Sequence, residues 1–203
     1  KTMNAIAEKG LDELKAEKCA VSPEMSAPDA LLIRSAKLHD AVFNKELLCI
    51  GRAGIGVDNI PIERCTAEGI AVFNTPGANA NAVKELVLCS LFLASRKVAS
   101  AVDWCKTLKG EGDAVGKLVE KGKSAFAGPE ILGKTLGVIG LGAIGTLVAE
   151  GAKALGMDIV GYNPGLSEER IADLTSKGIK LMSSLDELYA ASDYITLHLP
   201  LND

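Results

Sequence analysis

Three glycines with a fixed spacing stand between an apolar segment and a helical pattern. Gly140, Gly142 and Gly145 form the motif G-x-G-x-x-G directly after the apolar run 135–139. The first glycine allows a tight turn, the second lets an anion approach the backbone, and the third lets a helix pack close to the strand. Unpaired N–H groups at the start of that helix favour phosphate. This order of elements predicts a dinucleotide-binding site; the alternative is a corner whose glycines serve packing only.

The residue in position to bind the adenosine ribose departs from the usual pattern. In dinucleotide-binding units an Asp or Glu at the end of the second strand accepts the ribose hydroxyls. Here Asn163 follows the predicted strand 157–162. An amide can accept a hydrogen bond but lacks the charge that repels a 2′-phosphate. No Arg or Lys lies at 163–166 to bind such a phosphate, and Arg170 is the nearest. We predict NAD as the cofactor and leave strict discrimination against NADP open.

An arginine among glycines follows another buried strand, in the segment 51–59. The Arg52 guanidinium suits bidentate recognition of a carboxylate or phosphate, and the N–H groups of the nearby glycines can form an anion nest. The predicted ligand is a small acid, bound in the crevice between the first unit and the dinucleotide unit. The alternative is a structural loop in which Arg52 pairs with Asp58.

Further cationic residues follow the apolar run 30–33. Arg34, Ser35 and Lys37 stand where this strand ends, and such strand ends line the ligand crevice of open α/β sheets. Two cations and a hydroxyl suit a second anionic group on the substrate, while a solvated loop is the alternative. The two histidines, His39 and His198, are interpreted as surface or structural residues and not as acid–base catalysts.

Strands and helices must alternate along the chain to position these segments. Such alternation is typical of parallel α/β sheets. The predicted fold class is a Rossmann-type doubly wound parallel sheet domain plus a smaller flavodoxin-like α/β substrate domain. We place the substrate-binding domain at 1–98 and the NAD-binding domain, C-terminally incomplete, at 99–203. The predicted strands are 30–33, 47–50, 70–73, 135–139, 157–162, 179–182 and 194–198, and the predicted helices are about 6–17, 61–69, 81–98, 143–155, 168–176 and 186–190.

Two predicted helical regions lie between the domains. The helix 81–98 is apolar on nearly all sides, so we expect it to be buried or to lie at an interface. Residues 99–123 interleave lysines with acids and are expected to form a solvated helix pair or linker.

Composition limits the classes of partner. The net charge is −4 and no basic stripe is present, so nucleic acid is not an expected partner. The apolar run 86–94 is interrupted by Ser90 and falls short of the roughly 20 residues of a membrane span, so no membrane partner is expected. Five cysteines without a Cys-x-x-Cys pair indicate a reducing cytoplasm and no metal site. Strand-like residues at both ends indicate a fragment.

With these residues in view, the chain resembles the D-isomer-specific 2-hydroxyacid dehydrogenases over essentially its whole length. The resemblance is strongest to members that oxidise 3-phosphoglycerate. The order of several motifs makes it more specific than the glycine turn alone. The motifs are Ile33–Ser35, Gly51–Asn59, Asn74–Asn79 leading into Glu85-Leu86, Gly133–Gly137, Gly140–Gly145 and Leu197–Leu201.

The resemblance implies hydride transfer between NAD and C2 of a small anionic 2-hydroxy acid, namely oxidation of D-3-phosphoglycerate to 3-phosphohydroxypyruvate in serine biosynthesis. It also implies a homodimer or higher homo-oligomer, assembled through the nucleotide domains. In the family the catalytic Arg, Glu and His come later than residue 203, so no catalytic residue is expected within this chain. The fragment alone is expected to bind without turnover.

The resemblance also assigns binding roles. The substrate carboxylate would be held at Arg52, Ala53 and Gly54, and its phosphate near Arg34, Ser35 and Lys37. The nicotinamide would pass Ile55, the pyrophosphate would rest on Ala143 and Ile144, and the ribose would face Asn163. Leu199 and Pro200 would line the adenine side. The family usually has an acid at the position of Asn163 and often Arg at that of Ala143; both departures weaken the contacts that can be assigned.

Two other functions are compatible with these motifs. One is a dehydrogenase or reductase for an unphosphorylated acid such as glyoxylate or hydroxypyruvate. The other is a non-catalytic, NADH-sensing relative of the corepressor type. The phosphate-suited residues Arg34 to Lys37 favour the enzyme over the corepressor type.

Overall fold

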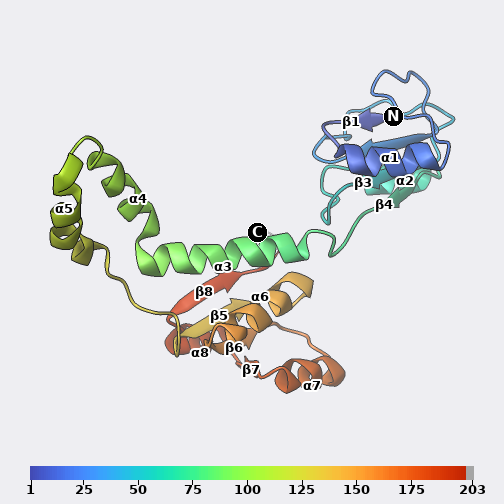
Figure 1. Cartoon of the computed structure of the whole chain (residues 1–203). Helices are drawn as coiled ribbons and strands as arrows, with labels where there is room; N and C mark the ends of the chain where they lie inside the picture. Colours follow the sequence, from blue (N-terminus) through green and yellow to red (C-terminus); the bar gives the residue numbers. More distant parts are fainter. Residues whose placement is uncertain (200–203) are drawn as a thin grey trace. The chain divides into compact units, whose positions relative to one another are not determined.

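The computed structural model describes residues 1–199 and divides the chain into two compact units, Lys1–Asn79 and Ala80–Asp203 (Figure 1). Each unit has its own parallel β-sheet and its own hydrophobic core. The α/β class predicted from the sequence is therefore confirmed.

Unit 1 is built on four parallel strands in the order β1-β2-β3-β4. Its core consists of side chains from the strands and from the loops that join them, with Ile33 and Ile50 fully buried at its centre. The elements are β1 (Thr2–Met3), α1 (Glu8–Ala16), β2 (Ala30–Ile33), β3 (Cys49–Arg52), α2 (Ile62–Ala67) and β4 (Ala71–Phe73).

Local sequence explains the helix bounds of unit 1 better than its strand bounds. Helix α2 begins after Pro61 and is followed by Gly69, whose φ of +74° suits glycine after a helix end. The predicted strand 47–50 lies two residues later, at Cys49–Arg52. Leu47 is buried although it precedes the strand. An apolar pattern predicts which residues are buried, but it does not show at which residue strand pairing begins.

Unit 2 carries a sheet of four parallel strands in the order β7-β6-β5-β8. The sheet therefore grows from β5 in both directions, as in a doubly wound Rossmann-type domain, and its topological switch point lies between β5 and β8. Its elements are β5 (Thr135–Ile139), α6 (Ala143–Ala154), β6 (Asp158–Tyr162), α7 (Glu168–Ser176), β7 (Lys180–Leu181), α8 (Leu185–Ala191) and β8 (Tyr194–Leu197).

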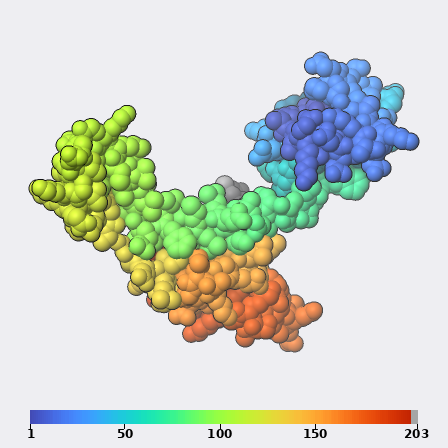
Figure 2. All heavy atoms as spheres, viewed as in Figure 1, coloured from blue at the N-terminus to red at the C-terminus, as the bar shows by residue number. Residues whose placement is uncertain are grey.

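The long helix α3 (Ala80–Arg96) belongs to unit 2, so the division at Asn79 replaces the predicted boundary at residue 98. It packs along α6, as Figures 1 and 2 show. The two helices approach closely at Gly151, where a Cβ would lie 3.0 Å from Leu88 Cδ1. Composition alone could not assign α3, because an apolar helix next to a boundary can pack on either side.

The segment after α3 forms short helices that pack on one another, as expected for a helix pair. They are α4 (Val98–Thr107), η1 (Gly112–Ala114), α5 (Val115–Gly122) and η2 (Lys123–Phe126). Among them Trp104 packs against Phe126, with ring centroids 5.0 Å apart. None of the described helices has the length and hydropathy needed to cross a membrane.

Leu47 and Leu48 provide a matched test of the unit 1 core, because Leu47 is 5 % exposed and Leu48 is 67 % exposed. Leu47→Ala should lower the free energy of unfolding of unit 1 by about 2–5 kcal/mol, since it leaves a cavity. Leu48→Ala should change it by less than about 0.5 kcal/mol. Urea unfolding followed through methyl NMR signals of unit 1 measures both. Equal losses in the two variants would contradict this assignment of the core.

Candidate functional site

The glycine turn of unit 2 joins β5 to α6 at the carboxyl edge of the sheet. Gly140 has a φ of +92°, which a side chain would strain, and a Cβ there would lie 2.8 Å from Leu199 Cδ2. A Cβ at Gly145 would overlap the carbonyl oxygen of Gly140. Gly142 differs from both, because a Cβ there would meet nothing within 4 Å. Two glycines are therefore required by packing, while the third faces open space.

The space in front of Gly142 lies at the start of α6. The N–H groups of Gly142, Ala143 and Ile144 have no acceptor among the described residues, and no side chain caps the helix. Gly142 and Ala143 are exposed. Open backbone N–H groups at the positive end of a helix dipole form a site for phosphate oxygens. The geometry of this turn fits a pyrophosphate.

Asn163 stands at the end of β6, next to the glycine turn. Its Oδ1 accepts a hydrogen bond of 2.9 Å from the N–H of Leu141, and its Nδ2 donates to the carbonyl of Pro164 at 3.0 Å. The amide therefore fixes the turn. Each amide atom keeps one further hydrogen-bonding position, so a contact with a ribose hydroxyl is compatible with these bonds.

Arg170, the nearest cation to the predicted ribose position, is already engaged. Its guanidinium donates to the carbonyl of Leu141 at 3.1 Å and to Oγ1 of the buried Thr146 at 2.7 Å, and it forms an ion pair with Asp173. These bonds tie α7 to the glycine turn from behind. A guanidinium held in this way is not available for a 2′-phosphate, which favours NAD over NADP.

The end of β8 borders the same turn. Leu199 lies against Gly140 and is half exposed, whereas Pro200, predicted with it to line the adenine side, lies outside the described residues. His198 Nε2 is 3.1 Å from Oγ1 of Thr196, and partial burial lowers the pKa of His198. A neutral, hydrogen-bonded ring at a strand end is consistent with the structural role assigned to this histidine.

In unit 1 the strand ends bring the predicted substrate residues to one edge of the sheet. Arg34 and Ser35 follow β2, and Arg52 ends β3, which pairs with β2 so that Ile33 lies beside Arg52. The side chains of Arg34, Ser35 and Lys37 are exposed, and that of Arg52 is half-buried. Parallel strands place these groups together because all their carboxyl ends share an edge.

Arg52 bends toward the neighbouring strand end. Its Nε donates to the carbonyl of Arg34 at 3.2 Å, and its guanidinium covers Gly54, where a Cβ would overlap it. Within the described part of the chain Arg52 makes no ion pair with Asp58, the alternative considered from the sequence. Its terminal nitrogens have no acceptor among these residues and can meet an anion.

The backbone N–H groups beside Arg52 fall into bonded and open ones. The N–H of Ala53 is bonded to the carbonyl of Ile33 at 2.8 Å, and that of Gly54 to the carbonyl of Arg52 at 2.9 Å. The N–H groups of Ile55 and Gly56 have no acceptor among the described residues. The open backbone donors therefore lie two residues after Ala53 and Gly54, because the sheet and a tight turn use the earlier N–H groups.

Three asparagines to which the sequence assigned no role hold these loops. Asn4 Oδ1 accepts from the N–H groups of Ser35 and Ala36, and Asn59 Nδ2 donates to the carbonyl of Ala36 at 2.8 Å. Asn74 Nδ2 donates to the carbonyl of Ile55 at 2.7 Å. All three follow strands or lie in loops, where asparagine commonly bonds to backbone. Their positions after strands and in loops are the sequence signal for this backbone-holding role.

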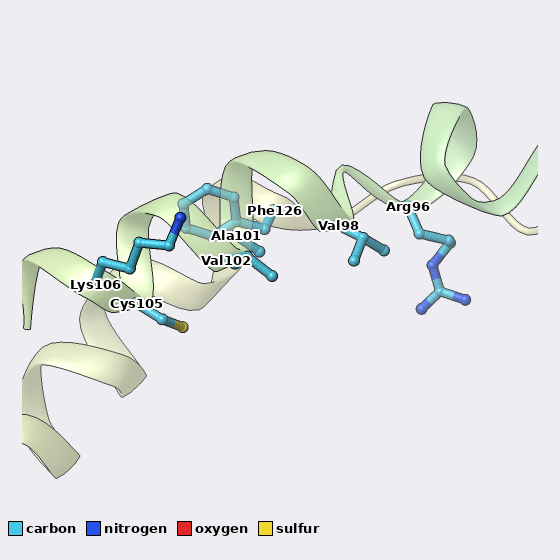
Figure 3. Close-up of a pocket in the computed structure, with 7 residues that line it drawn as sticks. All are labelled: Arg96, Val98, Ala101, Val102, Cys105, Lys106 and Phe126. Carbon is cyan, nitrogen blue, oxygen red and sulfur yellow. The ribbon is translucent and has the colours of Figure 1, made fainter. Parts of the chain in front are cut away.

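An apolar groove of about 570 Å³ lies elsewhere in unit 2 (Figure 3). It contains none of the predicted site residues and no carboxylate or histidine. We therefore do not assign it to the reaction. Among residues 1–199, no group of three His, Cys, Asp or Glu side chains is placed to hold a metal ion. The groove is lined by Arg96, Val98, Ala101, Val102, Cys105, Lys106 and Phe126.

Comparison with known proteins identifies the family. Residues 88–203 match the family described as D-isomer specific 2-hydroxyacid dehydrogenase, NAD binding domain. The chain belongs to this family, as its motifs predicted, and its second unit is an NAD-binding domain.

Individual relatives carry several names. The chain is 43 % identical over 176 residues to a D-3-phosphoglycerate dehydrogenase of Methanocaldococcus jannaschii, covering 85 % of this chain and 31 % of the relative. It is 40 % identical over 192 residues to a hydroxypyruvate reductase of Thermotoga maritima, covering 93 % and 56 %. A glyoxylate reductase structure from Paecilomyes thermophila superposes with a TM-score of 0.68 at 27 % identity, covering 96 % and 56 %. The chain thus spans about a third to just over half of these relatives.

Substitutions at Gly142 and Gly145 should distinguish an effect on NAD affinity from an effect on stability. Gly142→Ala should weaken NAD binding at least about tenfold, equivalent to roughly 1.4 kcal/mol, because the methyl group enters the space in front of the helix. Its melting temperature should stay unchanged. Gly145→Ala should instead lower the free energy of unfolding by about 1–3 kcal/mol, because its Cβ overlaps the backbone. Calorimetric titration with NAD and thermal unfolding measure both; normal NAD affinity in Gly142→Ala would rule out this role.

Proposed function

We propose that this chain provides the substrate- and NAD-binding parts of an NAD-dependent dehydrogenase that oxidises D-3-phosphoglycerate to 3-phosphohydroxypyruvate. The observation that supports this substrate is the pair of cationic strand ends in unit 1. One carries Arg52 and the other carries Arg34, Ser35 and Lys37. Two separate cationic positions on one sheet edge match an acid with a carboxylate at one end and a phosphate at the other.

The carboxylate site is proposed at Arg52 and the backbone after it. The terminal nitrogens of Arg52 suit bidentate binding, and the N–H groups of Ile55 and Gly56 add two neutral donors. Ala53 and Gly54 shape the loop and do not donate. Arg52 Nε donates a hydrogen bond to the carbonyl of Arg34. This bond fixes the position of the proposed carboxylate site relative to residues 34–37.

The phosphate site is proposed at the exposed side chains after β2. Arg34 can bind phosphate oxygens through a planar pair of N–H groups. Ser35 can donate a hydrogen bond from its hydroxyl, and Lys37 can add a positive charge. Hydrogen bonds to charged groups contribute about 1.5–3 kcal/mol each. These contacts distinguish a phosphorylated acid from an unphosphorylated one.

For the cofactor we propose that the pyrophosphate binds at Ala143 and Ile144, with the ribose at Asn163 and the adenine beside Leu199. The nicotinamide is assigned to Ile55. When bound, NAD supplies the acceptor for the hydride that leaves C2 of the hydroxy acid. The residues of this chain bind and orient the two molecules.

A reductase for an unphosphorylated acid is the second candidate. The relatives named hydroxypyruvate reductase and glyoxylate reductase support it, because family membership alone does not distinguish these substrates.

We also propose serine biosynthesis in the cytoplasm as the setting of the reaction, and a homodimer as the assembly. The outer face of α3 supports the homodimer, since Leu86 is 68 % exposed and Leu93 is also exposed.

The substrate assignment predicts a strong preference in the full-length protein. The value of kcat/KM for D-3-phosphoglycerate should exceed that for D-glycerate and D-lactate by about 100-fold, the factor that two charge-assisted contacts can provide. Arg34→Ala should reduce this ratio at least about tenfold. Production of NADH at fixed NAD concentration measures the ratio. Equal or faster oxidation of the unphosphorylated acids would favour the second candidate.

The assignment of Arg52 predicts a defect confined to the acid substrate. Arg52→Ala should raise KM for the hydroxy acid at least about tenfold, because a charge-assisted pair is lost. The dissociation constant for NAD should stay within about twofold. Lys9→Ala, which removes one exposed cation from α1, is the matched control and should change neither value. Loss of NAD affinity with KM intact would contradict the assignment.

A further inference from the structure

The loop after β2, residues 34–37, presents its polar side chains outward while its backbone is bonded on two sides. We call it the anion loop. On the carbonyl side, Arg52 Nε donates to the carbonyl of Arg34 and Asn59 Nδ2 donates to that of Ala36. On the N–H side, a single side chain, Asn4, accepts from two consecutive residues. The conformation of the anion loop therefore depends on groups outside it.

Asn4 is the residue that directly follows β1. Strand β1 pairs with β2 so that Met3 lies beside Ile33, which brings Asn4 next to the start of the anion loop. Its Oδ1 lies 3.2 Å from the N–H nitrogen of Ser35 and 2.7 Å from that of Ala36. Its φ of +73° is a left-handed conformation that asparagine tolerates better than most residues.

The two bonds to Asn4 decide how the anion loop can bind. Two consecutive backbone N–H groups could themselves form a nest for an anion. Because Asn4 Oδ1 occupies both, these two groups cannot form such a nest, and the exposed side chains of Arg34, Ser35 and Lys37 are the groups that we assign to the anion. Their directions follow from the backbone that Asn4 fixes. Without this acceptor, the loop would be held only through its carbonyl groups.

We propose that Asn4 is a positioning residue for the phosphate site, and that it thereby sets the preference for phosphorylated over unphosphorylated 2-hydroxy acids. This inference rests on the proposed function of the anion loop. Asn4 acts through Ser35 and Ala36 and is not assigned a contact with the substrate.

The left-handed backbone of Asn4 allows its side chain to be removed without straining the backbone. Asn4→Gly deletes the acceptor, and glycine adopts a positive φ without strain. Lys18→Gly is the matched control. Lys18 also has a positive φ, of +62°, and is exposed in the same unit, but makes no side-chain hydrogen bond among the described residues. Asn4→Asp is the conservative variant, because a carboxylate oxygen can accept the same two N–H bonds.

The test compares these variants of the full-length protein by steady-state kinetics and by amide hydrogen exchange. Asn4→Gly should raise KM for 3-phosphoglycerate about 3- to 10-fold, the range expected for one lost hydrogen-bonding group. Its kcat and its KM for D-glycerate should stay within about twofold. Exchange at the amides of Ser35 and Ala36 should become faster in Asn4→Gly and stay protected in Asn4→Asp. Lys18→Gly should match the wild type throughout.

A second probe separates this inference from the proposed function. Binding of inorganic phosphate is followed by NMR at the amide signals of residues 34–37, which requires no turnover. Weaker phosphate binding in Asn4→Gly than in Lys18→Gly supports the role of Asn4 even if the wild type oxidises unphosphorylated acids equally well, a result that overturns only the substrate assignment. Unchanged phosphate binding and unchanged KM in Asn4→Gly overturn the inference alone. Absence of phosphate binding by the wild-type loop overturns it together with the phosphate site.

Discussion

Parallel pairing of all strands is the constraint on which both candidate sites depend. In each sheet the strands end at a common edge, so residues distant in sequence meet there without any dedicated contact between them. In unit 1 this edge collects Asn4, Arg34 and Arg52. In unit 2 it collects the glycine turn, Asn163 and the end of β8. The chemistry of the chain follows from what each strand carries immediately after its last paired residue.

Strand ends also create a problem, because the loops after them leave backbone groups without sheet partners. Both units meet this need with side chains rather than with further strands. Asn4 and Asn59 hold the loop after β2, and Asn163 and Arg170 hold the glycine turn. The groups that remain open, such as the N–H groups at the start of α6, are then available to ligands. The side chains that hold these loops and the N–H groups that stay open both result from loops that begin where the strands end.

Much of the fold could be predicted because local signals are strong where an element has a defined beginning and end. Helix α6 follows a glycine turn, and α2 follows Pro61, and both were located correctly within a few residues. The predicted boundary at residue 98 differs from the division after Asn79, because the apolar helix α3 carries no signal for the surface on which it packs. The sequence could not show which N–H groups beside Arg52 are open, for a related reason. Which N–H groups are free depends on partners elsewhere in the sheet.

The sequence by itself determined the family, the α/β class, the glycine turn and the residue types that could meet an acid and a dinucleotide. These properties reside in short motifs, whose conformations are restricted by glycine, proline and alternating hydrophobicity. Only the tertiary structure decided that Arg170 is engaged by Leu141 and Thr146, and that Asn4 holds the anion loop. Such bonds join residues that are more than twenty positions apart, and a hydrogen bond across that distance is set by strand pairing and packing.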